Sequence, residues 1–220
     1  MKRALIIGGS RGLGLGLVRE HLARGWHVTA TYRTASPELE ASGASTLPLD
    51  VTDAAGIAAL AERLNGQKFD LLFVNPGIMA SRQPLSAAAP ADIDAMLLVN
   101  AIAPIRVADA LAGCVAASGT VAFMTSILGS IGTNEDGRME LYRASKAALN
   151  SLIRSFRARL PEAGITVLAL HPGVVRTSMG GPNAPLDIDT SVRGLADTIA
   201  ARQGSGGVAF VDYRNQVIPW

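Results

Sequence analysis

Residues 4–14 read ALIIGGSRGLG, a short apolar run followed by a turn rich in glycine. The run Ala4–Gly8 predicts a β-strand, and apolar residues at helical spacing beyond it predict a helix from about residue 12. Glycines at 8, 12 and 14 let the backbone turn tightly and approach a ligand where a Cβ would collide. The N-terminus of the following helix suits a pyrophosphate group, although such a turn can also serve only to pack a helix on a strand.

The same alternation of strand and helix continues along the whole chain. Further strands are predicted at His27–Tyr32, Ser45–Pro48, Asp70–Asn75, Thr120–Ser126, Thr166–His171 and Gly207–Phe210. Helices are predicted at about 12–24, 54–64, 92–117, 141–163 and 189–201, with a weaker candidate at 36–42. The pattern predicts an α/β Rossmann-type fold, in which residues 1–220 form a single domain around a seven-stranded, mainly parallel sheet with helices on both faces. Ligands in such sheets bind beyond the carboxyl ends of the strands.

Composition excludes several function classes. Hydrophobic residues make up 49% of the 220 and charged residues 17%, which is typical of a globular protein with a large core. The charge of +2 comes from 20 cations and 18 anions without a basic run, so no nucleic-acid partner is expected. Cys114 is the single cysteine, and the three histidines lack metal-ligand spacing. No stretch approaches the ~18 apolar residues of a membrane span, and the apolar run near the N-terminus is too short for an export signal. We therefore expect a cytoplasmic protein with no metal and no membrane partner.

The end of the second predicted strand indicates which dinucleotide would bind. An NAD site usually places an Asp or Glu there, to accept from the ribose 2′-hydroxyl. This chain has Tyr32, Arg33 and Thr34 instead. A guanidinium can bind a 2′-phosphate bidentately, and Arg11 in the glycine turn could reach the same group. NADP(H) is therefore favoured, the alternative being that both arginines are ordinary surface cations.

Residues 140–150 read ELYRASKAALN and place a phenol and an ammonium on one helical face. Tyr142 and Lys146 are four residues apart, and the same face continues through Leu149 and Ile153. Lysine is almost never buried without a partner. An ammonium beside the phenol would favour the phenolate and bring the pKa of Tyr142 closer to working pH. The pattern predicts an acid–base pair, unless Lys146 extends outward as a surface residue.

Several of these motifs resemble the short-chain dehydrogenase/reductase family. GGSRGLG resembles its T-G-x-x-x-G-x-G turn, with Ile7 where the family usually has Thr; YRASK resembles its Y-x-x-x-K. VNPG at 74–77 resembles N-N-A-G apart from Pro76, and HPGVVRTSM at 171–179 resembles P-G-x-V-x-T. TSILGSIG, YRASKAALN, HPGVVRTSMGG and the ending VIPW look most like the sniffer-type carbonyl reductases and the C-factor branch. The resemblance covers essentially the whole chain.

The resemblance implies an NADPH-dependent oxidoreductase that reduces a ketone or aldehyde to an alcohol. Its catalytic residues would be Asn100, Ser126, Tyr142 and Lys146. Tyr142 would donate the proton, Lys146 would bind the nicotinamide ribose and lower the Tyr142 pKa, and Ser126 would position the carbonyl. Ser126 precedes Tyr142 by sixteen residues rather than the family's usual thirteen or so, which leaves Thr125 and Ser130 as alternatives.

Asn100 gains support from backbone chemistry. Pro104 lacks the N–H that would bond the Asn100 carbonyl in a regular helix. A freed, buried carbonyl needs a partner, for which an ordered water is the best candidate. The resemblance implies an Asn here that holds a water connecting Lys146 to solvent. A simple proline kink is the alternative.

The resemblance also implies the cofactor-binding residues, which follow successive strands. They are Gly8, Ser10, Arg11, Gly12, Leu13, Gly14, Arg33, Asp50, Val51, Asn75, Gly77, Tyr142, Lys146, Pro172, Gly173, Val175 and Thr177. Asp50 would contact the adenine and the Val175 amide the carboxamide. The family commonly forms homodimers or homotetramers. The short segment Gly180–Ile188 predicts an open pocket with loose substrate choice, and the partner would be a small-molecule carbonyl or alcohol substrate. The alternative function is an NADP(H)-binding signalling or redox-sensing protein of C-factor type with little turnover.

Overall fold

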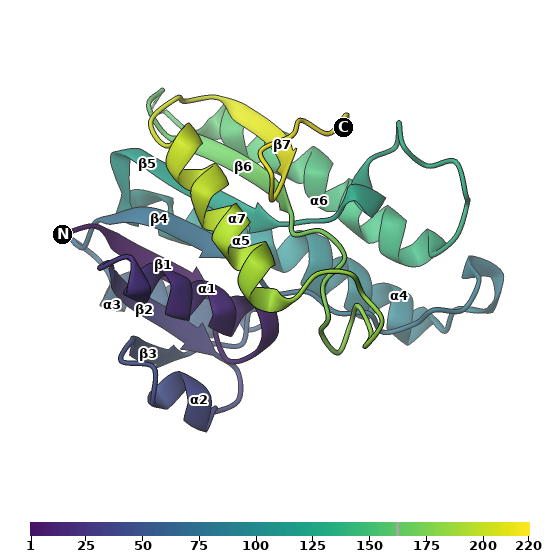
Figure 1. The fold of residues 1–220 in the computed structure, drawn as a ribbon, viewed down its shortest axis with the longest axis horizontal. Coiled ribbons are helices and arrows are strands. Elements are labelled where there is room, and N and C mark those ends of the chain that lie inside the picture. The colour runs from purple at the N-terminus through teal and green to yellow at the C-terminus, as the bar shows by residue number, and fades with distance from the viewer. Residues whose placement is uncertain (162) are drawn as a thin grey trace.

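The computed structural model describes residues 1–161 and 163–220 and contains one seven-stranded sheet (Figure 1). The strand order is β3-β2-β1-β4-β5-β6-β7, and every neighbouring pair is parallel. The strands are β1 (Arg3–Ile7), β2 (His27–Tyr32), β3 (Ser45–Pro48), β4 (Phe69–Val74), β5 (Val115–Met124), β6 (Thr166–His171) and β7 (Val208–Asp212). The prediction of a seven-stranded Rossmann-type sheet is confirmed. The strand order reverses between β1 and β4, the place where such sheets bind ligands.

Helices cover both faces of the sheet, and the side chains on both sides of the central strands are therefore buried. In β1, Leu5 and Ile7 pack into one core and Ala4 and Ile6 into the other. The first core also contains side chains of α3 (Ala54–Arg63), α5 (Ala103–Leu111) and α6 (Glu140–Arg159). The second contains side chains of α1 (Gly12–Ala23), α2 (Pro37–Glu40) and α7 (Ile188–Arg202). In Figure 1, α1 and α7 lie side by side across the sheet.

The helix predicted at 92–117 is divided in the structure, and the prediction of a helix at residues 115–117 is wrong. It consists of α4 (Pro90–Leu97), a π-helical turn (Leu98–Ile102), α5 and a 3₁₀ turn (Ala112–Cys114). Pro104 lacks an N–H for the Asn100 carbonyl, which accounts for the locally wider turn. Residues 115–117 belong to β5, where Val115 pairs with Phe69. Apolar residues fit a buried helix or a buried strand equally well, so periodicity could not place this boundary.

The other predicted elements agree with the structure to within a few residues at each end. The helix predicted at 141–163 ends at Arg159, and position 162 lies outside the described residues. Ser126, predicted inside a strand, lies two residues beyond the end of β5. Two further 3₁₀ turns cover Leu85–Ala87 and Ile127–Gly129.

One helical stretch differs from the expectation that no segment approaches a membrane span. Pro90–Cys114 is 25 residues long, and an 18-residue window in it has a mean hydropathy of 1.6, enough to span a membrane by length and composition alone. Half of that window is buried, however, and Ile105, Val107 and Leu111 pack in the core with β4 and β5. Core packing therefore accounts for the apolar character of the buried half of this window.

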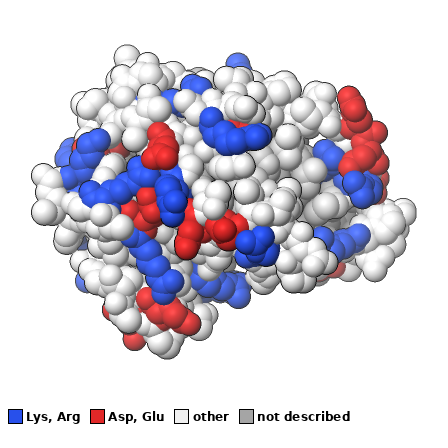
Figure 2. Space-filling view, in the orientation of Figure 1, with Lys and Arg blue, Asp and Glu red and all other residues white. Residues whose placement is uncertain are grey.

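The charged side chains on the face shown in Figure 2 are interspersed, with basic groups beside acidic ones. Arg24 illustrates the arrangement, because it pairs with Glu20 at 2.7 Å within α1 and with Asp197 of α7 at 2.8 Å. These pairs join two neighbouring helices. Exposed pairs of this kind typically contribute less than about 1 kcal/mol each.

Candidate active site

The turn after β1 depends on three glycines for two different reasons. Gly8 and Gly12 have φ values of +81° and +54°, which residues with a Cβ rarely adopt. A Cβ on Gly14 would lie 2.0 Å from the Gly8 carbonyl oxygen, so this glycine lets α1 approach the turn. Arg11, the N-cap residue of α1, makes no side-chain capping bond. The first N–H groups of the helix are therefore available to an anion.

A hydroxyl from the neighbouring strand stabilises this turn, although Ile7 has none. Thr31 of β2 accepts a hydrogen bond from the Gly8 amide at Oγ1 (3.0 Å) and one from the Gly9 amide at its carbonyl oxygen (2.7 Å). From the other side, Asn75 Nδ2 donates to the Gly8 carbonyl oxygen at 3.0 Å. Thr31 was missed by the sequence analysis. Its one signal is a polar residue inside an apolar strand.

A cleft of about 630 Å³ lies beyond the carboxyl ends of the strands, at the point where the strand order reverses. The predicted cofactor residues that line it are Gly8, Ser10, Arg11, Gly12, Leu13, Arg33, Asp50, Val51, Asn75, Gly77, Tyr142, Lys146, Pro172 and Thr177. Residues from both halves of the chain thus meet at one edge of the sheet. Among the described residues, no group of three or more His, Cys, Asp or Glu side chains is arranged to hold a metal ion.

Three predicted cofactor residues do not line the cleft. Gly14 lies behind the turn, in contact with Gly8. Gly173 has a φ of +81°, and a Cβ there would lie 2.4 Å from Leu186 Cδ1. Val175 is buried and forms a parallel bridge with Leu186. The structure gives these residues roles in shaping the surrounding backbone.

The two predicted arginines belong to the lining of the cleft. Arg11 and Arg33 both line it and are exposed, as is Glu38 at the start of α2. Asp50 accepts hydrogen bonds from the Thr52 amide (2.9 Å) and hydroxyl (2.7 Å). These bonds lower the pKa of Asp50, and the charge of Arg33 adds to the effect. Asp50 is therefore a fixed carboxylate close to a guanidinium.

Tyr142 and Lys146 lie on one buried face of α6, as predicted. Tyr142 is 8% exposed and Lys146 only 2%. The Lys146 Nζ donates to the carbonyl oxygen of Met124, at the end of β5, over 3.0 Å, and lies 5.9 Å from the centre of the Tyr142 ring. An ammonium has three donors, so two others are available to a ligand in the cleft. The buried cation is thus held at the cleft wall by a strand end.

The pKa of Tyr142 moves in the direction opposite to the expectation. Burial raises the pKa of Tyr142 to about 12, and hydrogen bonding with Ser126 offsets this only in part. Burial also lowers the pKa of Lys146 to about 8. The phenol packs against Met96 and Leu141, where charge is poorly solvated. The expected lowering of the Tyr142 pKa is therefore not produced by this chain alone.

The three candidate hydroxyls near Tyr142 have different surroundings. Ser126 caps the turn Ile127–Gly129, accepting from the Leu128 amide at 3.1 Å, and it lies close enough to Tyr142 to affect its pKa. The Thr125 hydroxyl donates to Asn150 Oδ1 at 2.7 Å. Ser130 is buried and lines a separate cavity of about 390 Å³. Of the three, Ser126 is the hydroxyl whose environment is coupled to the phenol.

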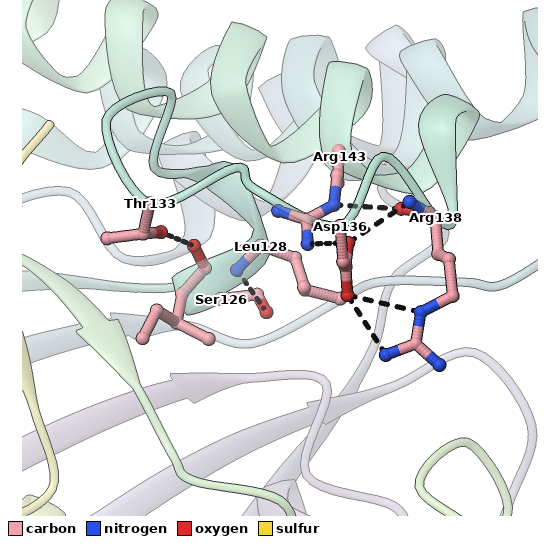
Figure 3. A network of polar contacts seen from close by, with 7 residues as sticks. Ser126, Leu128, Thr133, Asp136, Arg138 and Arg143 are labelled. Atoms are coloured by element: carbon pink, nitrogen blue, oxygen red, sulfur yellow. Dashed lines mark hydrogen bonds and ion pairs between the residues drawn. The ribbon is translucent and has the colours of Figure 1, made fainter.

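The longer spacing between Ser126 and Tyr142 is taken up by a loop fastened to α6 (Figure 3). Arg143, the neighbour of Tyr142, pairs with Asp136 at 2.7 Å and donates to the Arg138 carbonyl oxygen at 2.8 Å. Met139 adopts a left-handed conformation (φ 60°) just before the helix begins. The extra residues therefore form a loop that is bonded to the first turn of α6.

Asn100 connects the loop after β4 to α6. Its Oδ1 accepts from the Ile78 amide at 2.7 Å, and its Nδ2 donates to the Ile78 carbonyl oxygen at 2.9 Å and to Ser145 Oγ at 3.0 Å. Ser145 in turn donates to the Tyr142 carbonyl oxygen at 2.8 Å. A Cβ on Gly77 would lie 3.4 Å from Lys146 Nζ, so this glycine keeps the space beside the ammonium open. Ser145 was not anticipated from the sequence.

Met179 is a second unanticipated residue, and it contacts the phenol directly. The Tyr142 hydroxyl donates to the Met179 sulfur over 3.8 Å. Met179 lines the cleft and follows the predicted Thr177 motif. No pattern in the sequence links it to Tyr142, since the two residues are 37 positions apart.

Comparison with known proteins places these features in a family context. Residues 2–185 match the family described as short chain dehydrogenase. A carbonyl reductase from Pseudomonas aeruginosa PAO1, solved in complex with NADP, is 41% identical with a TM-score of 0.92, and 100% of each chain is covered. The carbonyl reductase Sniffer of D. melanogaster is 31% identical with a TM-score of 0.88, again over 100% of each chain. The C-signal protein of Myxococcus xanthus is 37% identical over 153 residues, which are 69% of this chain and 92% of that protein.

Proposed function

The chain belongs to the short-chain dehydrogenase family, and from this membership we propose that it reduces a ketone or aldehyde carbonyl to an alcohol with NADPH. Relatives of the carbonyl reductase type that bind NADP support the assignment. The observation that carries it is the buried Tyr142–Lys146 pair at the wall of a cleft that two arginines also line.

The residues that line the cleft suit the successive parts of NADP(H). The Gly8 and Gly12 backbone and the first amides of α1 would hold the pyrophosphate, because no Cβ blocks their approach. Arg11 and Arg33 would bind the 2′-phosphate, and Lys146 would bind the nicotinamide ribose. Thr177 also lines the cleft and would hold the nicotinamide half. When bound, the dinucleotide supplies the hydride for the carbonyl carbon.

Tyr142 would supply the proton for the carbonyl oxygen. A pKa of about 12 keeps the hydroxyl protonated at neutral pH but makes it a weak acid, so the positive charges of Lys146 and of the oxidised nicotinamide would have to lower that pKa during the reaction. Ser126 would orient the carbonyl beside it. Asn100, through Ser145, would fix the backbone of Tyr142, and a water held near the Asn100 carbonyl would restore the proton through Lys146.

Replacing Tyr142 by Phe tests this function. The variant removes one oxygen and should reduce turnover by about 10²–10⁴-fold, the usual contribution of a positioned proton donor. NADPH affinity should stay close to that of the wild type, because the ring and Lys146 are retained. Turnover is measured as NADPH oxidation with a panel of carbonyls, and affinity by fluorescence titration. Wild-type turnover in Tyr142→Phe would refute the assignment.

A binding-only role in signalling is the second candidate, motivated by the likeness to C-signal. It is not favoured, because a sensor has no need for a proton donor and the groups that orient it. Tyr142 and Lys146 line the cleft, Asn100 is connected to the Tyr142 backbone through Ser145, and Ser126 lies close enough to Tyr142 to affect its pKa. Tight NADPH binding without oxidation by any carbonyl tested would favour this second candidate.

We also propose that residues 1–220 act as one domain, in the cytoplasm, and as a homodimer or homotetramer. Family members commonly associate through the helices equivalent to α4–α6. Leu97 and Ile102 support this, since both are more than a third exposed on the same helical stretch. Light scattering of the purified protein measures the assembly, and a monomeric mass would contradict it.

A further inference from the structure

The side chain of Met179 stands where a substrate would have to meet the proton donor. Its sulfur accepts the Tyr142 hydroxyl bond at 3.8 Å, and the residue lines the same cleft as Lys146 and Pro172. A carbonyl oxygen that receives a proton from Tyr142 must come within about 3 Å of the same hydroxyl. The sulfur and the carbonyl oxygen therefore compete for one hydrogen-bond donor.

The backbone on both sides of Met179 is fixed. Arg82 Nη2 donates to the Met179 carbonyl oxygen at 2.7 Å. The Gly180 amide donates to Thr177 Oγ1 at 3.1 Å, and the Gly181 amide to the Thr177 carbonyl oxygen at 2.9 Å. A Cβ on Gly180 would lie 2.1 Å from the Val175 carbonyl oxygen, so this segment is also tightly packed. Movement at this point thus falls to the Met179 side chain.

The chemistry of a thioether suits a side chain that can be displaced. Methionine is unbranched, has three side-chain bonds that rotate easily, and its sulfur is only a weak acceptor. The side chain is partly buried against the small apolar cluster around Tyr142, which includes Ile78, Leu128 and Met139. A carbonyl oxygen is the better acceptor, so exchanging the sulfur for it costs little hydrogen-bond energy.

We propose that Met179 is a specificity-determining gate. Its thioether accepts the hydrogen bond of the Tyr142 hydroxyl in the substrate-free enzyme, and the substrate carbonyl displaces it. The proposal rests on the proposed carbonyl reduction and names the residue that selects its substrates. A displaced Met179 stays beside the bound carbonyl and fills part of the space around it. It therefore favours compact carbonyls and admits bulky ones only as far as the side chain can move aside.

Met179→Ala and Met179→Leu test the gate, with Met79→Ala as the matched control. Met79 packs against the same cluster but does not line the cleft or bond to Tyr142. Met179→Ala should raise kcat/KM for a bulky aromatic ketone relative to a small aliphatic aldehyde by about tenfold, mainly through KM. Met179→Leu keeps the bulk without the sulfur, so it should keep the wild-type size preference and lower KM for both carbonyls. Met79→Ala should match the wild type.

A titration of the phenol tests the same contact without turnover. Water can reach the hydroxyl in Met179→Ala, so the pKa of Tyr142 should fall from about 12 toward its usual value near 10. The phenolate absorbance of each protein, minus that of the same protein carrying Tyr142→Phe, isolates this residue from Tyr32 and Tyr213.

The possible outcomes distinguish a failure of the Met179 gate from a failure of the proposed carbonyl reduction. If the wild type reduces carbonyls and Met179→Ala matches Met79→Ala in both selectivity and titration, the gate is overturned and the function stands. If the wild type reduces no carbonyl, the proposed function fails, and the gate fails with it. A rise in bulky-ketone preference together with a lowered Tyr142 pKa, in Met179→Ala alone, supports the gate.

Discussion

Burial of the Lys146 ammonium costs free energy, because the charged group loses its contact with water. This ammonium has lost almost all contact with water and gains one carbonyl partner, Met124, so its pKa falls to about 8. In the proposed complex, ribose hydroxyls in the cleft would give this ammonium further hydrogen-bond partners. The residue is therefore better adapted to a bound dinucleotide than to the stability of the chain by itself.

Arg33 lines the cleft and is the residue on which we expect the choice of dinucleotide to depend. Arg33→Ala should weaken NADPH binding by about 10–100-fold, since a hydrogen bond to a charged group contributes roughly 1.5–3 kcal/mol. NADH, which lacks the 2′-phosphate, should bind as it does to the wild type. Fluorescence titration with both nucleotides measures the difference.

Arg63→Ala is the control for this change, because Arg63 is exposed at the end of α3 and does not line the cleft. It should leave both affinities unchanged. Equal losses of NADPH and NADH affinity in Arg33→Ala would contradict a contact with the 2′-phosphate.

At the scale of elements, the turn between β1 and α1 has almost no spare volume. Gly14→Ala would bring a Cβ to 2.0 Å from the Gly8 carbonyl oxygen and 2.8 Å from Asn75 Nδ2. Because both neighbours are fixed, we expect a loss of at least about 1–3 kcal/mol in the free energy of unfolding. NADPH binding should weaken with it, as the turn shifts.

Urea unfolding of Gly14→Ala and Gly113→Ala measures this effect. Gly113 lies in the turn Ala112–Cys114 and has open space where a Cβ would be added, so its variant should unfold close to the wild-type midpoint. Equal stability of the two variants would show that the close contact at Gly14 can relax.

The side-chain amide of Asn100 connects the loop after β4 to α6 by hydrogen bonds. Asn100→Ala removes both bonds to Ile78 and the bond to Ser145. Buried backbone groups left without partners should lower the free energy of unfolding by about 1–3 kcal/mol. Because Ser145 holds the Tyr142 backbone, kcat should fall more than NADPH affinity. Asn65→Ala, at an exposed position, is the control and should change neither. A variant that is destabilised but retains wild-type kcat would limit Asn100 to a structural role.

Across the whole molecule, we expect two histidines, the buried His21 and the partly buried His171, to lower the stability in acid. Burial lowers the pKa of His171 to about 4, against the opposing charge of Asp212, and burial lowers the pKa of His21 as well. The unfolded chain, with histidine near 6.5, therefore binds more protons than the folded one between pH 6.5 and 4. Stability should fall as the pH drops through this window.

His171→Gln should flatten that dependence, because it removes a shift equivalent to roughly 3 kcal/mol at most. Urea midpoints at pH 7, 5.5 and 4.5 measure the slope. His27→Gln is the control, since His27 is exposed. The hydrogen bond from the Arg138 amide is the chief reason that the pKa of Asp136 is lowered to about 2. Asp136 therefore affects stability only at a lower pH than the histidines do. An unchanged slope in His171→Gln would assign the acid sensitivity to other groups.

The sequence by itself determined the strand–helix alternation, the glycine turn after β1 and the helical face shared by Tyr142 and Lys146. Each of these is local, because periodicity and the backbone chemistry of glycine and proline act over a few residues. Even the wider turn at Asn100 has a local cause in Pro104. The start of β5 was not determined, because its apolar residues suit a helix as well as a strand.

Only the tertiary structure decided which distant groups complete the site. Thr31 replaces the hydroxyl missing at Ile7 because β2 lies beside β1, and Met179 reaches Tyr142 because the loop after β6 lies over the same cleft. The pKa of Tyr142 likewise follows from how completely its surroundings exclude water, a sum over residues from many elements. Contacts and solvation of this kind depend on the order of strands in the sheet, and no pattern within one segment encodes them.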